Sequence, residues 1–506
     1  MRREASLRKF GRDLTAIDYR PSMAFAMTCL VLIVAFALGG SSRADVPALL
    51  FLRPAATVML GYGLWTLRPA HIAAHRFLFA FAVAALAIPL LHLVRLPETM
   101  WAGMPGHGLL AEIDRSAGLA KVLRPLSIAP EATRNALLSE LVPLAVLVLG
   151  AQLPERELHL LLPVLLGMGA ISATLAVMQT VSAADVPQPL YGTSTDGSAV
   201  GLFVNRNHQA LFLATMFPML ARAAANVRAA SPPAGARTLR MLLVPLLSAA
   251  FALCLMPLLL VTGSRAGLVL GLAAILTMPL FILRQPNRPA WIQRSRSGPN
   301  APGLRWWATR RGKALLAAVC VLLVTGIVWA VISTAYASGR TEAFDRFRSS
   351  SIVDDLRFRA FATIWSMLGH YWPLGSGAGT FEKAYFMAEP DSLLGAVFMN
   401  HAHNDWLEVG VTTGIAGVSL LVAAVVAFAL RSYRTVMAML ETPADRSKST
   451  QFVLLGLVVI LLCALASLGD YPLRVPSLAC VLVVAALWAD GRQPVQRTGT
   501  VALDDN

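Results

Sequence analysis

Long apolar runs separated by short polar stretches dominate this chain. A run of about 20 apolar residues is long enough to cross the hydrocarbon core of a bilayer as a helix, and about twelve runs approach that length. They lie near 22–40, 48–67, 77–95, 136–152, 159–182, 207–227, 241–262, 266–283, 314–333, 406–430, 451–468 and 475–490. The second and fourth runs are the weakest, because Arg53 lies inside the second and the fourth is short. The pattern predicts an all-α polytopic membrane protein.

Composition supports this fold class. Of the 506 residues, 56% are hydrophobic and 14% are charged, whereas soluble domains have about 25% charged residues. The five cysteines, Cys29, Cys254, Cys320, Cys463 and Cys480, all lie in expected spans, so the sequence predicts neither a disulfide framework nor a thiolate metal site.

The positions of the basic residues predict the orientation. Lys and Arg are enriched in short cytoplasmic loops, and the N-terminal arm and the segment 284–313 are the most basic stretches. Both lie in the cytoplasm if the N-terminus does, and so do the loops near 228–240 and 431–448. The net charge of +15 is scattered over loops, which argues against a nucleic-acid-binding surface. A cleaved signal peptide ending near GGSSRAD is an alternative that leaves the later topology unchanged.

The expected organisation has five parts. They are a cytoplasmic basic arm at 1–21, transmembrane helices 1–9 in 22–333, a periplasmic loop at 334–405, transmembrane helices 10–12 in 406–490 and a cytoplasmic tail at 491–506. The long loop has apolar residues at helical spacing (Phe361, Ile364, Trp365 and Leu368), which predicts a helix along the membrane surface. The turn PLGSGAGTF follows this helix and is expected to be flexible.

Three polar clusters lie on the expected periplasmic face. Arg265 lies in the tight turn GSRAG, and Asn205, Arg206, Asn207 and His208 come directly before a span in GLFVNRNHQA. The long loop adds Arg357 and Arg359. A guanidinium at a bilayer boundary either reaches lipid phosphates or binds an anionic substrate group, for which its planar fork of donors is well suited.

The stretch HAHNDWLEVGVTTGIAG at 401–417 brings proton-handling side chains to the mouth of a span. Asp405 and Glu408 resemble a capping box, so a helix is expected to begin near Asp405. His403 and Asn404 would then lie at the positive end of that helix, which favours a neutral imidazole that can act as a base. The alternatives are that His401 and His403 only anchor the helix at the interface, or that they bind zinc, although no cluster with ligand spacing accompanies them.

The residues here resemble a known family. His403, Asn404, nine residues, Gly414, two residues and Gly417 match the signature of bacterial O-antigen ligases and related lipid-linked glycan polymerases. The segments GLFVNRNHQA, TGSRAGL and R…W…PLGSGAG also resemble family elements, so the similarity covers about 125–430. One extra residue between Trp365 and Pro373 leaves open whether Arg357 or Arg359 matches the family arginine.

The resemblance implies an inverting glycosyl transfer without metal or other cofactor. The donor would be a glycan linked to undecaprenyl pyrophosphate, and the acceptor a hydroxyl at the periplasmic face of the bacterial inner membrane, in lipopolysaccharide or surface-polysaccharide biosynthesis. His403 would be the general base, and Arg265 and Arg357 would hold the pyrophosphate. The residues expected to bind substrate are Arg206, Arg359, Asn205, Asn207, His401 and Asn404. The alternative for Asn404 is that it caps the helix or orients His403.

Several alternatives remain open at this point. The acceptor is the lipid A core in a ligase, another lipid-linked glycan in a polymerase, or Ser or Thr in a protein glycosyltransferase; the family as a whole favours the ligase. A transporter of lipid-linked sugars would also need basic residues, but it gives no reason for a His-Asn pair, and no internal repeat is evident. A scaffold for polysaccharide export would need none of these clusters. In every case the other partners are membrane lipids, and no nucleic acid is expected.

Overall fold

The computed structural model describes most of the chain. The described residues are 21–119, 121–181, 198–229, 239–282, 352–395, 399–441 and 448–491, with isolated positions at 187–188, 191, 193–194, 326 and 333. The expected basic arm, the basic segment 284–313 and the polar tail beyond 491 lie outside these residues. The expected span at 314–333 also lies outside them, apart from two single positions.

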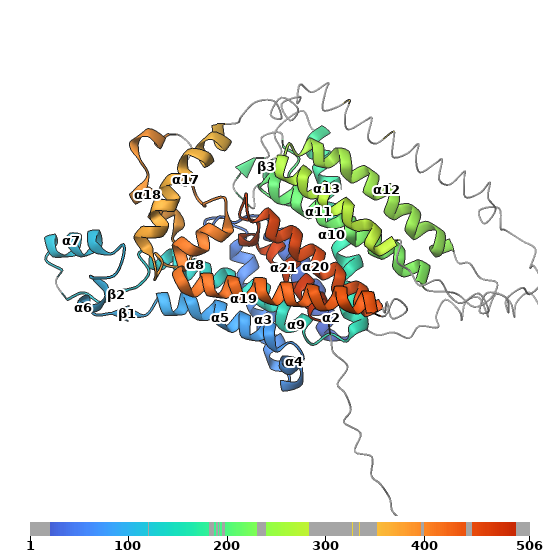
Figure 1. The fold of residues 1–506 in the computed structure, drawn as a ribbon, viewed down its shortest axis with the longest axis horizontal. Coiled ribbons are helices and arrows are strands. Elements are labelled where there is room, and N and C mark those ends of the chain that lie inside the picture. Colours follow the sequence, from blue (N-terminus) through green and yellow to red (C-terminus); the bar gives the residue numbers. More distant parts are fainter. Residues whose placement is uncertain are drawn as a thin grey trace, which may run out of the picture.

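The described part is a bundle of helices with very short strands (Figure 1). The α-helices are α2 (Met23–Leu38), α3 (Leu49–Thr66), α4 (Pro69–Ala74), α5 (Arg76–His92), α6 (Glu98–Trp101), α7 (Gly108–Ser116), α8 (Pro130–Ser139), α9 (Leu141–Gly150), α10 (Glu155–Val181), α11 (Arg206–Ala229), α12 (Leu239–Val261), α13 (Arg265–Ile282), α17 (Ile352–Tyr371), α18 (Phe381–Ala388), α19 (Asp405–Glu441), α20 (Lys448–Ala466) and α21 (Pro476–Asp490). Two 3-10 helices are η2 (Asp391–Leu393) and η3 (Pro472–Arg474). Strand β1 (Arg95–Leu96) pairs with β2 (Arg124–Pro125), and β3 (Pro187–Gln188) pairs with β4 (Thr193–Ser194), both antiparallel.

The structure confirms a multi-pass helical membrane protein but does not establish twelve spans. Every expected span outside 314–333 coincides with a described helix. Seven of the described helical segments are long and apolar enough to cross a membrane, with α8 and α9 counted together, and three further apolar helices, α2, α5 and α21, are shorter. The weak second run forms α3, in which the guanidinium of Arg53 bonds to Asn135 and Ser139 of α8. These hydrogen bonds give the guanidinium polar partners inside an otherwise apolar helix.

Helix α11 forms the centre of one half of the bundle. It contacts α10, α12, α13 and α20, and Phe212 and Phe217 on it are almost fully buried. A helix that is buried on all sides belongs to the interior of a large bundle. The N-terminus of α11 is therefore fixed by packing along the whole helix, and Asn205 and Asn207 lie at this end.

Helix α17 forms as expected, but its buried face differs from the predicted one. Ile364 is 1% exposed, whereas Phe361 and Trp365 are 53% and 60% exposed and stack on each other. The buried side of the helix carries Ala360, Ile364, Met367 and Tyr371. These residues also recur at helical spacing, but their stripe is rotated around the helix axis away from Phe361 and Trp365. Helix α17 packs against α19 through this stripe.

The glycine-rich turn after α17 is held in place rather than free, which corrects the expectation of flexibility. Helix α19 has a kink at Gly414, where φ is +59° and ψ is −146°. The turn fills this kink: the Ile415 amide donates to the Pro373 carbonyl at 2.8 Å, and the amides of Ser376 and Gly377 donate to the carbonyls of Val411 and Thr412. The kink frees backbone groups, and the turn satisfies them. Helices α17 and α18 therefore sit at the start of α19 (Figure 1).

Candidate functional site

The start of α19 positions the central histidine. The helix begins at Asp405, as predicted, and Asn404 caps it, because its Oδ1 accepts a hydrogen bond from the Leu407 amide at 3.0 Å. Asp405 and Glu408 do not form the expected capping box, because their carboxylates bond elsewhere. His403, just before the cap, has a positive φ of 50°. This left-handed backbone turns its side chain away from the helix axis and toward the α20–α21 connection.

Asp470 on that connection joins two segments that are distant in sequence. His403 Nδ1 lies 3.2 Å from Asp470 Oδ1. Asn207 Nδ2 donates to Asp470 Oδ2 at 2.7 Å, and Asn205 Nδ2 lies 3.4 Å from the same oxygen. The Asp470 side chain is 5% exposed. A buried carboxylate that accepts these bonds fixes the imidazole in one orientation.

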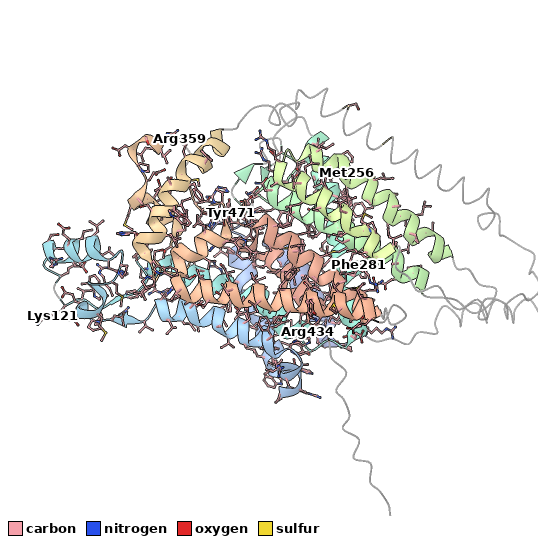
Figure 2. The ribbon with its side chains drawn as sticks, in the orientation of Figure 1. Lys121, Met256, Phe281, Arg359, Arg434 and Tyr471 are labelled. Atoms are coloured by element: carbon pink, nitrogen blue, oxygen red, sulfur yellow. The ribbon has the colours of Figure 1, made fainter. Side chains whose placement is uncertain are left out.

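Tyr471 lies among the three imidazoles of the site. Its ring centroid is 4.3 Å from that of His401, 4.9 Å from that of His403 and 5.3 Å from that of His208. The residue is 7% exposed, and Figure 2 shows it near the middle of the molecule. Its phenol ring therefore forms an apolar wall that keeps the histidines apart and limits their rotation.

A second ionic cluster lies beside the first and ties the His401 side of the site together. His401 Nδ1 is 3.0 Å from Glu408 Oε1, and the Ala402 amide donates to the other Glu408 oxygen. Arg474 binds both carboxylates, with Nη2 3.2 Å from Glu408 and Nε 3.2 Å from Asp405. Burial alone would lower the pKa of Arg474, but the two carboxylates outweigh burial and raise the pKa. The arginine therefore stays charged and fixes the α20–α21 connection against α19.

Arg474→Gln is expected to lower the free energy of unfolding by about 3 kcal/mol, because it leaves buried carboxylates without their counter-charge. The double variant Arg474→Gln/Glu408→Gln should recover part of this loss. As a matched control, Arg134→Gln removes an arginine from an exposed pair with Glu131 and should change stability by less than about 0.5 kcal/mol. Thermal unfolding of the purified proteins measures all three. Equal effects of Arg474→Gln and Arg134→Gln would contradict the role of the cluster.

Two further helices begin next to the group formed by His403, Asp470 and Asn207, each with one of the predicted arginines. Arg265 is the first residue of α13, and Ser264 before it donates its hydroxyl to Asn207 Oδ1 at 2.8 Å. Arg206, half-buried, is the first residue of α11. The N-terminus of a helix carries partial positive charge and free amide donors. Helices α11, α13 and α19 all start here, so the site favours a negatively charged group.

The two loop arginines lie on α17. Arg359 is exposed, and its Nη2 donates to the Ser392 carbonyl at 2.9 Å. Figure 2 shows it at the outer end of α17, away from Tyr471. Arg357 is on the same helix, but its side chain lies outside the described part of the chain. The structure therefore brings together His401, His403, Asn404, Asn205 and Asn207, with Arg206 and Arg265 at adjacent backbone positions; Arg357 and Arg359 stay predictions.

The segment GDYPLR at 469–474 was not among the polar clusters that the sequence pattern singled out. It supplies Asp470, Tyr471 and Arg474. An acidic, an aromatic and a basic residue in a six-residue connection on the same face as His403 were the available signal. Without the packing of α19 against α20, nothing in the sequence paired Asp470 with His403.

Comparison with known proteins gives one family match. A family model described as O-antigen ligase matches residues 249–422. The matched stretch lies within the region 125–430 that carried the resemblance, and it contains Arg265, His403 and the kink at Gly414. No curated protein matches the chain.

Proposed function

We propose that this chain, whose residues 249–422 match the O-antigen ligase family model, is a membrane glycosyltransferase of the O-antigen ligase superfamily that uses a glycan linked to undecaprenyl pyrophosphate. The acceptor is a hydroxyl group, and the reaction takes place at the periplasmic face of the bacterial inner membrane. The observation that carries this proposal is the pairing of His403 with Asp470 at a point where three helices begin.

His403 is proposed to act as the general base. When Nδ1–H donates to Asp470 Oδ1, the ring carries its lone pair on Nε2, and this nitrogen takes the proton of the acceptor hydroxyl. The acceptor oxygen forms a bond to the anomeric carbon while the bond from that carbon to the pyrophosphate oxygen breaks, which inverts the anomeric centre. The carboxylate of Asp470 stabilises the imidazolium that results. It also offsets the α19 dipole, which alone disfavours that cation.

The leaving pyrophosphate is proposed to bind at the N-termini of α11 and α13. Arg206 and Arg265 begin these helices, and their guanidinium groups suit phosphate oxygens. Arg357 of α17 is proposed to complete the binding of the pyrophosphate. Charge that develops on the leaving group is stabilised by these fixed donors. The donor is already activated, so positioning and electrostatics account for catalysis, and the scheme requires no metal.

A complementation experiment tests the transferase against the transporter. A deletion strain receives the wild-type gene or none, and surface polysaccharide and lipid-linked glycan are quantified with their membrane sidedness. Loss of polymer with accumulation of periplasm-facing lipid-linked glycan supports the proposal. Accumulation facing the cytoplasm would instead identify a transporter. The length of the accumulated glycan separates a ligase, which leaves complete chains, from a polymerase, which leaves single repeat units; a ligase to lipid A core is our first choice.

Asp470→Asn is expected to lower kcat by about 10- to 100-fold with KM changed less than about twofold, because the amide keeps the shape of the side chain but loses the charge that stabilises the imidazolium. Asp114→Asn is the matched control, since Asp114 pairs with Arg124 near β2, outside the site. Initial rates in proteoliposomes with purified lipid-linked glycan give both constants. A rise in KM with normal kcat would show that Asp470 acts in binding instead.

A further inference from the structure

A large groove lies among α5, α9, α19, α20 and α21, apart from the site around His403. Its volume is about 1570 Å³, larger than the roughly 300–1,000 Å³ of most small-molecule pockets. The lining is mainly apolar and includes Phe77, Phe81, Leu144, Leu147 and Phe428. Phe77 is 41% exposed, so the groove opens on the side of the bundle, where acyl chains are present.

The arginines of this groove gather at one end. Arg76, Arg431 and Arg434 line it, together with the carboxylate of Asp490. Contacts place Arg431 and His75 at this end: Arg431 Nε donates to the Ala489 carbonyl at 2.8 Å, and His75, next to Arg76, lies 2.6 Å from Asp490 Oδ2. Arg434 follows Arg431 by about one turn of α19. Three positive charges therefore face one negative charge, which His75 already contacts. Glu140 is the other carboxylate that lines the groove. It lies just before the start of α9, whereas the arginines lie near the far end of α9, next to Gln152, so Glu140 does not offset their charge.

This basic end is remote from the glycosyl-transfer site. From Gly414 to Arg431, α19 advances about 25 Å at 1.5 Å per residue. His403 is farther still from Arg431, because it lies just before the start of α19 at Asp405. That separation is close to the hydrocarbon thickness of a bilayer. A pyrophosphate bound near His403 therefore lies too far away to contact Arg431 or Arg434. Figure 2 likewise shows Arg434 well away from Arg359 of α17.

We infer that this groove binds one anionic phospholipid from the membrane leaflet opposite the His403 site, with its acyl chains along α5 and α19 and its phosphate at Arg76, Arg431 and Arg434. Basic side chains at a membrane surface attract anionic headgroups. Arg76 and Arg434 form no ion pair with any residue that the structure describes, so their charge is available for a lipid phosphate. The inference does not depend on the proposed glycosyl transfer.

Native mass spectrometry of the full chain tests this site, with phosphatidylglycerol and phosphatidylethanolamine as probes. The wild type should retain one phosphatidylglycerol in preference to phosphatidylethanolamine. Arg434→Gln should weaken that binding about fivefold, the effect of one surface arginine. Ala427→Phe should also weaken it, because Ala427 lines the groove and a phenyl ring would occupy the space of an acyl chain.

Arg68→Gln is the matched control. Arg68 is exposed at the same end of the bundle, between α3 and α4, and does not line the groove. An equal loss with Arg68→Gln, or equal retention of both phospholipids by the wild type, would overturn the inference. A third outcome would also overturn the inference. In it, undecaprenyl phosphate displaces phosphatidylglycerol from the wild type and binds equally well to Arg434→Gln, because the groove would then hold a polyprenyl chain.

Discussion

His403→Ala is expected to lower the rate of glycosyl transfer by about 10²- to 10⁴-fold, the usual contribution of a general base. The imidazole is the group that would accept the hydroxyl proton, and Asp470 at 3.2 Å holds it in place. Initial rates with purified lipid-linked glycan in proteoliposomes measure the effect. In cells, the same variant should accumulate the lipid-linked donor.

Backbone strain requires a second variant at this position. The φ of His403 is +50°, and asparagine adopts such a conformation more readily than alanine does. His403→Asn should therefore be as stable as the wild type but as inactive as His403→Ala. His370→Ala, on the exposed side of α17, is the matched histidine control and should keep full activity. Normal transfer by His403→Asn would mean that the imidazole only anchors the start of α19.

Gly414→Ala is expected to lower the free energy of unfolding by more than about 3 kcal/mol, since its backbone conformation is nearly restricted to glycine and costs other residues about 1–3 kcal/mol before any clash. A Cβ at this position would lie 2.0 Å from the Pro373 carbonyl oxygen and 2.6 Å from the carbonyl carbon of Leu374. Backbone atoms cannot move aside cheaply, so the glycine-rich turn would have to leave the kink. Thermal unfolding of the detergent-solubilised protein and its level in membranes report the effect.

The matched control for Gly414 is Gly61 in α3. No atom lies within 4 Å of a Cβ built there, and alanine is favoured over glycine in a helix by up to about 1 kcal/mol. Gly61→Ala should therefore unfold at the same or a higher temperature than the wild type. If Gly414→Ala behaves like Gly61→Ala, the kink is not fixed by its contact with the glycine-rich turn.

Local patterns were sufficient for the helices and for where they begin. The start of α19 at Asp405 and the cap by Asn404 follow from residues within a few positions of each other, and so does helix α17. Its buried stripe did not follow, because Phe361 and Trp365 are more hydrophobic than Ala360, yet Ala360 is buried and the two aromatic residues are exposed. Hydrophobicity predicts that a helix has a buried face, while shape complementarity selects which face it is.

The sequence by itself determined that this protein spans a membrane repeatedly and that His403 stands at the mouth of a span, since hydropathy and helix capping are properties of neighbouring residues. Only the tertiary structure decided that Asp470 faces His403, that Asn207 shares the same carboxylate, and that a glycine-rich turn fills the kink at Gly414. His403 and Asp470 are 67 residues apart. Their contact depends on how α19 packs against α20 and α21, and this packing results from many weak side-chain contacts that no local pattern encodes.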